Sequence, residues 1–396
     1  MDLDIHYSNN KLSLMAPTLE GHLKTYALDY LNKLNLYRPI GFFEDSPVYS
    51  LYQPPLATRA GIKSFKNRLL RKKGELKAPA TATIAVNKAC QCDCSHCSAV
   101  YYNQASQRDL SSLELTNALA ETCALGVSTI ILLGGEPLLR KDLFEVISQI
   151  PKNEASVILF TNGEYLNDDN CRKLKKAGLM GAFVSLDHPE ESQHDQFRKR
   201  PGLYKKALQG ITNLKNNGLI AGISSHLSHS NLPLKQFEQM VELTKQVGAD
   251  EITFFDAIPS GQWLHDSSEI LNDTDRETIS RLVKLYRNKK DYPGLSVQST
   301  LTSPKGSAFC FAANTQFYLT AWGEMCPCDF TPLSIGRYPE LSIKQLWDKM
   351  TSCAPYHTRA KACRMQDKNF REKYIDTIPA KGPYPYPLNI PSKDDS

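Results

Sequence analysis

Short apolar runs alternate with amphipathic stretches between residues 81 and 255. The helical pattern over 112–125 is the clearest, because Ser111 and Glu114 form a capping box at its start and Gly126 supplies a stop. Later helical patterns also end at a glycine. This order of strand, helix and glycine predicts parallel strands joined by right-handed crossovers, an α/β sheet or barrel with its active site at the strands' carboxyl ends. The six predicted strands are 81–86, 129–133, 156–160, 181–186, 220–224 and 251–255.

The regions on either side follow other patterns. A helix over 19–34, a proline-containing loop and a basic helix predict an accessory region at the N-terminus. Beyond the repeat, helical patterns over 273–287 and 342–350 flank short strands and a turn at Gly323. Closely spaced prolines exclude regular helix and central strand from the last segment. The predicted divisions are an accessory region 1–79, a core 80–265, a small α+β domain 266–378 and a proline-rich tail 379–396.

Composition places the chain among ordinary globular proteins. Hydrophobic residues make up 41% and charged residues 22%, and no apolar run reaches the length of about 18 residues that a membrane helix needs. The opening residues lack the basic and apolar blocks of a secretory signal, so a cytoplasmic location is expected. The net charge of +5 arises locally, from eight basic residues and one acid between Arg59 and Lys77. Such a strip fits a solvated or docking face better than a nucleic-acid footprint.

Eleven cysteines are more than core packing requires, and disulfides do not persist in a reducing compartment, so metal binding is the better explanation. Cys90, Cys94 and Cys97 have the spacing C-x3-C-x2-C directly after the first predicted strand. Three such thiolates can bind three irons of a four-iron cluster and leave the fourth iron open. A structural zinc ion is the alternative for this loop, with Cys92 or His96 as the fourth ligand.

Further motifs follow the later strands. They are Gly134-Gly135-Glu136-Pro137, Thr161-Asn162-Gly163, Ser185-Leu186-Asp187 and His194-Asp195-x-x-Arg198. With the cysteine loop, in one order on successive strands, they resemble the motifs of the radical S-adenosylmethionine (radical SAM) enzymes over residues 80–261. The resemblance implies a partial (β/α)6 barrel of the TIM type. His188-Pro189 stands where the family usually has glycine, so the loop after the fourth strand is expected to differ in shape.

The resemblance also implies cofactors and chemistry. Cys90, Cys94 and Cys97 would hold a [4Fe-4S] cluster whose open iron binds SAM. One electron, from a flavodoxin- or ferredoxin-type reductant, would split SAM into methionine and a 5′-deoxyadenosyl radical that abstracts hydrogen from a substrate C–H bond. The residues expected to contact SAM are His96, Gly134, Gly135, Glu136, Pro137, Thr161, Asn162, Ser185, Asp187 and Arg198.

A second group of cysteines lies near the C-terminus. Cys310, Gly323 and Cys328, with the segment that follows them, resemble the auxiliary-cluster domain called SPASM, or its shorter twitch form. The resemblance implies one auxiliary iron–sulfur cluster of the [4Fe-4S] type on Cys310, Cys328 and Cys363. The fourth ligand is Cys353 or Cys326, or that iron stays open, and Cys353 is preferred here. In some relatives a carboxylate at the position of Asp329 acts as a base, and we weigh this role equally against a simple surface charge.

Three functions follow for comparison. The first is a radical SAM enzyme that modifies a peptide or protein side chain, and the basic strip could then dock an acidic leader or partner. The second is the same chemistry on a small molecule such as a sugar, nucleoside or amino acid. The third is a non-catalytic, zinc-stabilised binding protein, which leaves the glycine-rich and Thr161-Asn162-Gly163 motifs unexplained. The first is slightly favoured.

Overall fold

A computed structural model describes residues 2–103, 106–287, 289–303, 305, 308–379 and 381–388. Its centre is a nine-stranded sheet in the order β11-β10-β9-β8-β7-β6-β5-β12-β13. The six predicted strands are β5 (Thr81–Ala85), β6 (Thr129–Leu133), β7 (Ser156–Thr161), β8 (Gly181–Ser185), β9 (Ile220–Leu227) and β10 (Glu251–Asp256). They are parallel, as predicted. Within the described residues the sheet is open, with β11 and β13 at its edges.

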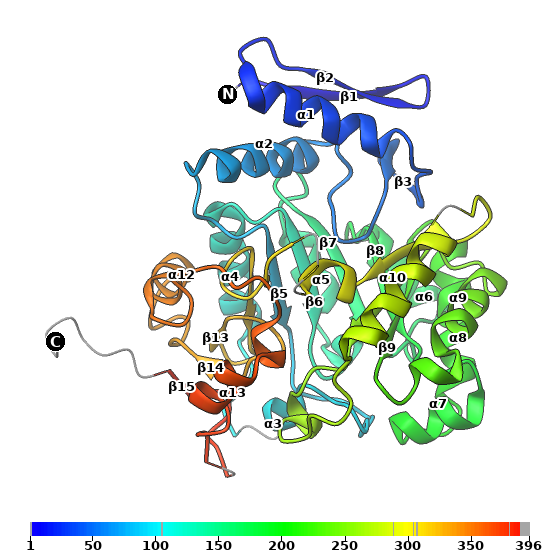
Figure 1. Cartoon of the computed structure of the whole chain (residues 1–396), viewed down its shortest axis with the longest axis vertical. Helices are drawn as coiled ribbons and strands as arrows, with labels where there is room; N and C mark the ends of the chain where they lie inside the picture. The colour runs from blue at the N-terminus through cyan, green and yellow to red at the C-terminus, as the bar shows by residue number, and fades with distance from the viewer. Residues whose placement is uncertain are drawn as a thin grey trace, which may run out of the picture.

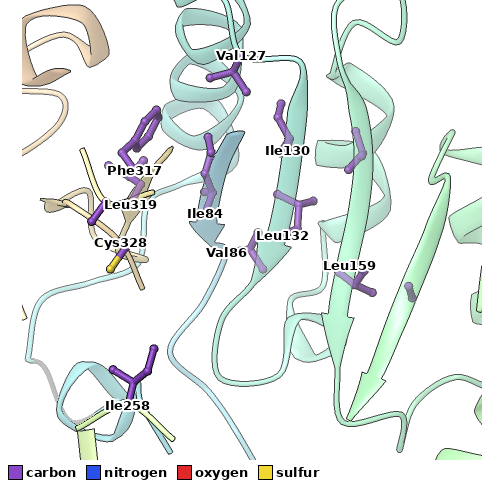
Figure 2. Close-up of a cluster of buried hydrophobic side chains, with 14 of the residues drawn as sticks. Ile84, Val86, Val127, Ile130, Leu132, Leu159, Ile258, Phe317, Leu319 and Cys328 are labelled. Atoms are coloured by element: carbon purple, nitrogen blue, oxygen red, sulfur yellow. The ribbon is translucent and has the colours of Figure 1, made fainter. Parts of the chain in front are cut away.

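Helices cover the outer face of this sheet (Figure 1). The capping box of Ser111 and Glu114 and the left-handed stop at Gly126 are both present around α4. Apolar residues of β5, β6 and β7 point toward the helices and form one large core, part of which Figure 2 shows. The helices between and after the strands are α4 (Ser112–Leu125), α5 (Leu143–Gln149), α6 (Asp168–Lys176), α7 (Glu191–Arg198), α8 (Leu203–Asn216), α9 (Gln236–Gln246) and α10 (Asp273–Arg287).

The N-terminal region lies over the amino ends of the parallel strands (Figure 1). Its elements are β1 (Asp4–Ser8), β2 (Lys11–Met15), α1 (Gly21–Leu34), β3 (Gly41–Phe43), β4 (Ser46–Val48) and α2 (Arg59–Lys73). Leu51, just after β4, wedges into the sheet where Gly181 and Gly222 leave room, since a Cβ at either glycine would lie 2.7 or 3.1 Å from the Leu51 side chain. The accessory region therefore closes one end of the sheet.

The basic strip lies on α2 and is partly used within the chain. The Lys63 ammonium bonds to Glu154 at 2.5 Å and to the Cys123 carbonyl. Arg68 and Lys72 lie 4.7 Å from the ring centres of two tyrosines on α1. These three cations join the accessory region together and to the core.

The C-terminal region supplies the strands at both edges of the sheet. The predicted turn at Gly323 joins β12 (Gln316–Leu319) and β13 (Met325–Cys326) in an antiparallel hairpin. The hairpin joins the core sheet, because β12 pairs in parallel with β5. The strand near Ser296, β11 (Gly294–Val297), likewise pairs with β10, so both short strands belong to the core sheet. The remaining elements include α3 (Val100–Asn103), η3 (Gly261–Trp263), α11 (Ser299–Thr302), β14 (Leu333–Ser334), α12 (Ile343–Ser352), η4 (Arg364–Gln366), α13 (Lys368–Tyr374) and β15 (Tyr386–Pro387).

None of the described helices has the length and apolarity to span a membrane.

Candidate active site

The cysteine loop leaves the carboxyl end of β5 and is held from three directions. The backbone of Glu136 donates to the Ala89 carbonyl at 2.7 Å, and Ser95 donates from its backbone to the Phe197 carbonyl at 2.9 Å. The Cys97 carbonyl accepts from the backbone of Gln262 at 3.1 Å. Three segments, which follow β6, β8 and β10, therefore fix the positions of the thiols.

Gly134 and Gly135 are required by the close packing of two backbones. A Cβ at Gly134 would lie 2.4 Å from the Asn87 side-chain oxygen, and one at Gly135 would lie 2.2 Å from the Ala89 carbonyl oxygen. The glycines thus let the loop after β6 contact the cysteine loop itself. Pro137 follows as the first residue of a short 3-10 helix.

Glu136 is fully buried beneath this contact. Its carboxylate accepts from the Thr161 hydroxyl at 2.7 Å, from the Asn162 backbone at 2.8 Å and from the Leu138 backbone at 3.1 Å. Burial raises the pKa of Glu136 to about 7, against the lowering effect of these donors. The glutamate thereby ties the loop after β6 to the end of β7.

Asp187, just beyond the end of β8, carries the densest set of charged contacts. The Arg198 Nε donates to its Oδ2 at 2.5 Å, while His96 Nε2 and His226 Nδ1 lie 3.6 and 3.4 Å from its Oδ1. Burial alone would raise the pKa of Asp187, but Arg198 and the two imidazoles hold it well below its usual range. Asp187 is therefore anionic and lies at the centre of the charged contacts at the carboxyl ends of the strands. Ser185, two residues earlier, is the last residue of β8.

The three residues of the His194-Asp195-x-x-Arg198 motif make different contacts. The His194 ring accepts from the Asp187 backbone at 3.2 Å, and burial lowers the pKa of His194 to about 4, so the ring stays neutral. Asp195 accepts from the backbone of Tyr204 at 2.8 Å and so caps α8. Only Arg198 faces the cysteine loop, with Nη1 3.9 Å from the Cys94 sulfur.

Four rings gather above Asp187. His96 stacks on Phe197 with ring centres 4.6 Å apart and on His226 at 5.2 Å, and Trp263 lies 6.0 Å from His96. Burial lowers the pKa of His96 to about 3, so this imidazole is neutral. Flat aromatic rings beside a carboxylate suit a heteroaromatic base and its ribose hydroxyls.

The thiols differ in acidity. A hydrogen bond from Cys92 and, against the effect of burial, the charge of Arg198 lower the pKa of Cys94 to about 7. The Cys92 thiol also forms a hydrogen bond with Cys90. This bond lowers the pKa of Cys90 and raises the pKa of Cys92. Cys92 thus shares hydrogen bonds with two predicted ligands. Because the thiolate is the form that binds iron, the Arg198 charge favours metal loading at Cys94.

These residues fit the cofactors that the motifs imply. Cys90, Cys92 and Cys97 line a cavity of about 280 Å³, together with Lys88, Ala89, Asp93, Val100 and Asn103. Buried polar atoms without a hydrogen-bond partner in the described chain lie nearby, among them Gln91 Oε1 and His96 Nδ1. Such atoms are typical of a site shaped for a polar ligand.

Within the described residues, His96, Asp187 and His226 form the group compact enough for one metal ion, with ligand atoms within 4.8 Å of one another.

The C-terminal cysteines separate into two environments. Cys310 and Cys328 both raise the pKa of the buried Cys363, which places these three thiols within electrostatic reach of one another. Cys353 instead donates to the Met350 carbonyl at 3.0 Å, at the end of α12. Cys326 packs with tyrosine and tryptophan rings in a separate apolar cluster. The structure therefore brings Cys310, Cys328 and Cys363 within electrostatic reach of one another, Cys326 is also within reach of Cys328, and the fourth ligand stays a prediction.

Asp329 follows Cys328 and faces the interior of the sheet. Its Oδ1 accepts from Gln316 Nε2 at 3.4 Å, and burial raises the pKa of Asp329 to about 6. The next residue, Phe330, has its ring centre 5.9 Å from that of Phe255 on β10. Tyr318 is within electrostatic reach of both Asp329 and Cys97, so this carboxyl and the cysteine loop flank one buried tyrosine.

Sequence reasoning missed several residues of the site. His226, Phe197 and Trp263 were not singled out, although they complete the ring cluster. Along β9, His226 lies on the face opposite the apolar residues that pack against the helices. Trp263 is one of only three tryptophans in the sequence. These signals become specific only when the carboxyl ends of the strands are known to converge.

Comparison with known proteins agrees with this geometry. The sequence model of the Radical SAM superfamily matches residues 84–244. An AdoMet-dependent heme synthase of Methanosarcina barkeri (strain Fusaro / DSM 804) is 26% identical over 299 residues, 68% of this chain and 82% of the relative. The sporulation killing factor maturation protein SkfB of Bacillus subtilis (strain 168) is 24% identical over 73% of this chain and 70% of its own length. The crystal structure of Streptococcus suis SuiB bound to precursor peptide SuiA covers 87% of each chain with a TM-score of 0.57 and 14% identity.

Residues 84–244 are therefore a Radical SAM domain, the domain that defines the radical SAM class of enzymes. The resemblance drawn from the motifs is confirmed. Proteins of this class bind a [4Fe-4S] cluster and S-adenosylmethionine, and both cofactors suit the cysteine loop and the polar site beside it.

Proposed function

We propose that this enzyme reductively cleaves SAM and abstracts hydrogen from a C–H bond of a peptide or protein side chain. The observation that carries the proposal is the convergence of Cys90, Cys94 and Cys97 with Asp187, Arg198 and the aromatic rings at one end of the sheet. When bound, the cluster and SAM supply the 5′-deoxyadenosyl radical, which takes a hydrogen atom from the substrate.

The residues of the chain then have distinct tasks. Cys90, Cys94 and Cys97 hold the cluster, and the hydrogen bond from Cys92 together with the charge of Arg198 favours the thiolate form of Cys94. Asp187 and the rings around it orient the adenosine part of SAM. The remaining predicted SAM contacts lie in the loop after β6 and at the carboxyl ends of β7 and β8, and they are Gly134, Gly135, Glu136, Pro137, Thr161, Asn162 and Ser185.

Asp329 is the proton acceptor in this proposal. A pKa of about 6 leaves its carboxylate mostly deprotonated at neutral pH and basic enough to take a proton from an oxidised substrate. Cys310, Cys328 and Cys363 would hold an auxiliary iron–sulfur cluster next to Asp329, and such a cluster supplies a one-electron acceptor.

The substrate class is supported by different relatives. The names of SkfB and of the SuiB complex concern maturation and a precursor peptide, which favours a peptide here. A small molecule is the second candidate, favoured by the likeness to an AdoMet-dependent heme synthase over 68% of this chain.

The first test is anaerobic reconstitution followed by iron and sulfide analysis and dithionite-driven turnover of SAM. We expect about eight irons per chain, from two four-iron clusters, and formation of 5′-deoxyadenosine. Zinc without either iron or deoxyadenosine would instead support the non-catalytic binding protein.

The second test addresses the substrate and Asp329. A peptide encoded beside the gene, deuterated in its side chains, should pass deuterium into 5′-deoxyadenosine. Asp329→Asn should keep SAM cleavage and deuterium transfer but lose oxidised product. Deuterium transfer only from small molecules would reject the peptide assignment, and product formation at the wild-type rate would reject the role of Asp329.

A further inference from the structure

One loop of the core connects the SAM site with the C-terminal region. It runs from Ala257 to Leu264 after β10 and contains the short helix η3. Gly261 lies against the cysteine loop so closely that a Cβ would lie 2.0 Å from the Cys97 carbonyl oxygen, and its φ of +51° favours glycine. The next residue, Gln262, donates its backbone N–H to that same carbonyl. The loop therefore presses directly on a predicted cluster ligand.

The same loop completes the ring cluster. The Trp263 ring centre is 6.0 Å from that of His96 and 5.9 Å from that of His226. Both imidazoles face Asp187. A displacement of this loop would therefore move the wall that receives the adenosine.

The C-terminal region holds the loop from its other side. Arg371 of α13 is only 7% exposed, and it donates to the Pro259 carbonyl at 3.2 Å and to the Leu264 carbonyl at 2.5 Å. Gln366 adds a hydrogen bond to the Ala257 carbonyl at 3.3 Å. A buried guanidinium is costly unless its donors are satisfied, and here two of its partners are the carbonyls of this one loop.

These contacts begin next to the C-terminal thiols. Cys363 directly precedes η4, which contains Gln366, and α13 with Arg371 follows without a break. The Cys363 backbone is itself fixed by donation to the Thr302 carbonyl at 2.9 Å. One continuous segment thus carries a predicted auxiliary-cluster ligand at one end and the two side chains that hold the loop at the other.

We propose that Arg371 is a positioning residue, which sets the loop of residues 257–264 against the cysteine loop and so couples the C-terminal cysteine site to SAM binding. The proposal rests on the proposed function in taking that site as the SAM site. Gln366 supports the same loop more weakly. The coupling is mechanical: the segment that orders around Cys363 also fixes the carbonyls behind Trp263.

The test uses ¹⁹F NMR of the full chain labelled with 5-fluorotryptophan. Three resonances are expected, one for each tryptophan, and Trp263→Phe assigns the relevant one. Arg371→Ala should shift the Trp263 resonance and leave those of Trp322 and Trp347, which report on the core. In the anaerobically reconstituted protein it should also weaken SAM binding about tenfold, with a smaller effect on the maximal rate of deoxyadenosine formation.

Matched variants separate positioning from general stability. Asp376→Asn removes the exposed ionic partner of Arg371 but keeps both carbonyl contacts, so the Trp263 resonance and SAM affinity should match wild type. Arg371→Lys should restore part of the affinity, since an ammonium can still donate to a carbonyl. Gln366→Ala should shift the Trp263 resonance less than Arg371→Ala does.

The outcomes are distinguishable. Unchanged Trp263 resonances in Arg371→Ala and Gln366→Ala would overturn the proposal, and if Arg371→Ala does not fold, Arg371→Lys and Gln366→Ala decide it in the same way. An equal loss of affinity in Asp376→Asn would also overturn it. A wild-type protein that binds no SAM would reject the proposed function, whereas the Trp263 resonance would still report whether Arg371 positions the loop.

Discussion

Two buried carboxylates at opposite ends of the parallel sheet, Glu251 and Asp187, have partners of opposite kinds. At the amino ends, Glu251 accepts from the Ser50 hydroxyl and the Leu51 backbone of the accessory region and from the Ser296 hydroxyl, so neutral donors of the chain itself surround it. At the carboxyl ends, Asp187 faces Arg198 and two imidazoles. One end is closed by the protein's own N-terminal segment, while the other presents a charged pair and aromatic rings that a ligand can contact.

The difference shows in the direction of the pKa shifts. Burial raises the pKa of Glu251, because its neutral donors do not compensate for lost hydration. The pKa of Asp187 is instead held low by a neighbouring cation. The direction of the pKa shift thus follows from whether a cation lies beside the carboxylate, and Glu136, which also has neutral donors, likewise has a raised pKa.

The largest effect on the site at the carboxyl ends of the strands is expected from Cys94→Ala. Removing one of three cluster ligands should abolish 5′-deoxyadenosine formation, since the remaining thiols cannot complete the SAM-binding cluster. Iron bound at the C-terminal cysteines should remain, which iron analysis and electron paramagnetic resonance can measure. Undiminished SAM cleavage would refute the assignment of the cysteine loop.

Arg198→Ala comes next. It removes the cation beside Asp187 and Cys94, so we expect a loss of about a hundredfold in the rate of SAM cleavage. Arg198→Lys, which keeps the charge but changes its geometry, should lose less. Arg172→Ala on α6 is the matched control, because Arg172 is an exposed member of a surface ion pair. A loss of the same size in that control would make the effect nonspecific.

A pH titration addresses the substrate side of the active end. Asp329 must be deprotonated to accept a proton, so product formation should rise with pH through about 6 and fall about tenfold per pH unit below it. Deoxyadenosine formation measured over the same range provides the reference. In Asp329→Asn the ionisation near pH 6 should disappear from the residual product rate, and its persistence would assign it to another group.

The smallest effect on catalysis is expected at the amino ends of the strands, which the accessory region covers. Glu251→Ala leaves the buried Leu51 N–H without its acceptor and should lower the free energy of unfolding by about 2 kcal/mol. Urea denaturation measures this change. Deoxyadenosine formation per folded molecule should stay at the wild-type level, and a specific loss of turnover would show that the two ends are coupled.

Much of the core was predictable from local pattern. The six strands follow from apolar runs of strand length, and the boundaries of α4 follow from Ser111, Glu114 and Gly126. The order of the motifs predicted that the cysteine loop, Glu136 and Asp187 lie at one end, because parallel strands share a carboxyl edge.

Other features depend on contacts between distant segments. The placement of β12 beside β5 joins residues more than 200 positions apart, and no local period encodes that pairing. Of the C-terminal thiols, Cys353 caps a helix end while Cys310, Cys328 and Cys363 converge. Spacing alone does not distinguish these positions.

The sequence by itself determined the class of chemistry, because the spacing of Cys90, Cys94 and Cys97 and the residue types at successive strand ends are local properties. Only the tertiary structure decided which groups act together. The acidity of Cys94 depends on Arg198, and the position of Trp263 on Arg371, from segments about 100 residues away in the chain. Electrostatic and packing energies depend on distance in space, which the order of residues does not specify.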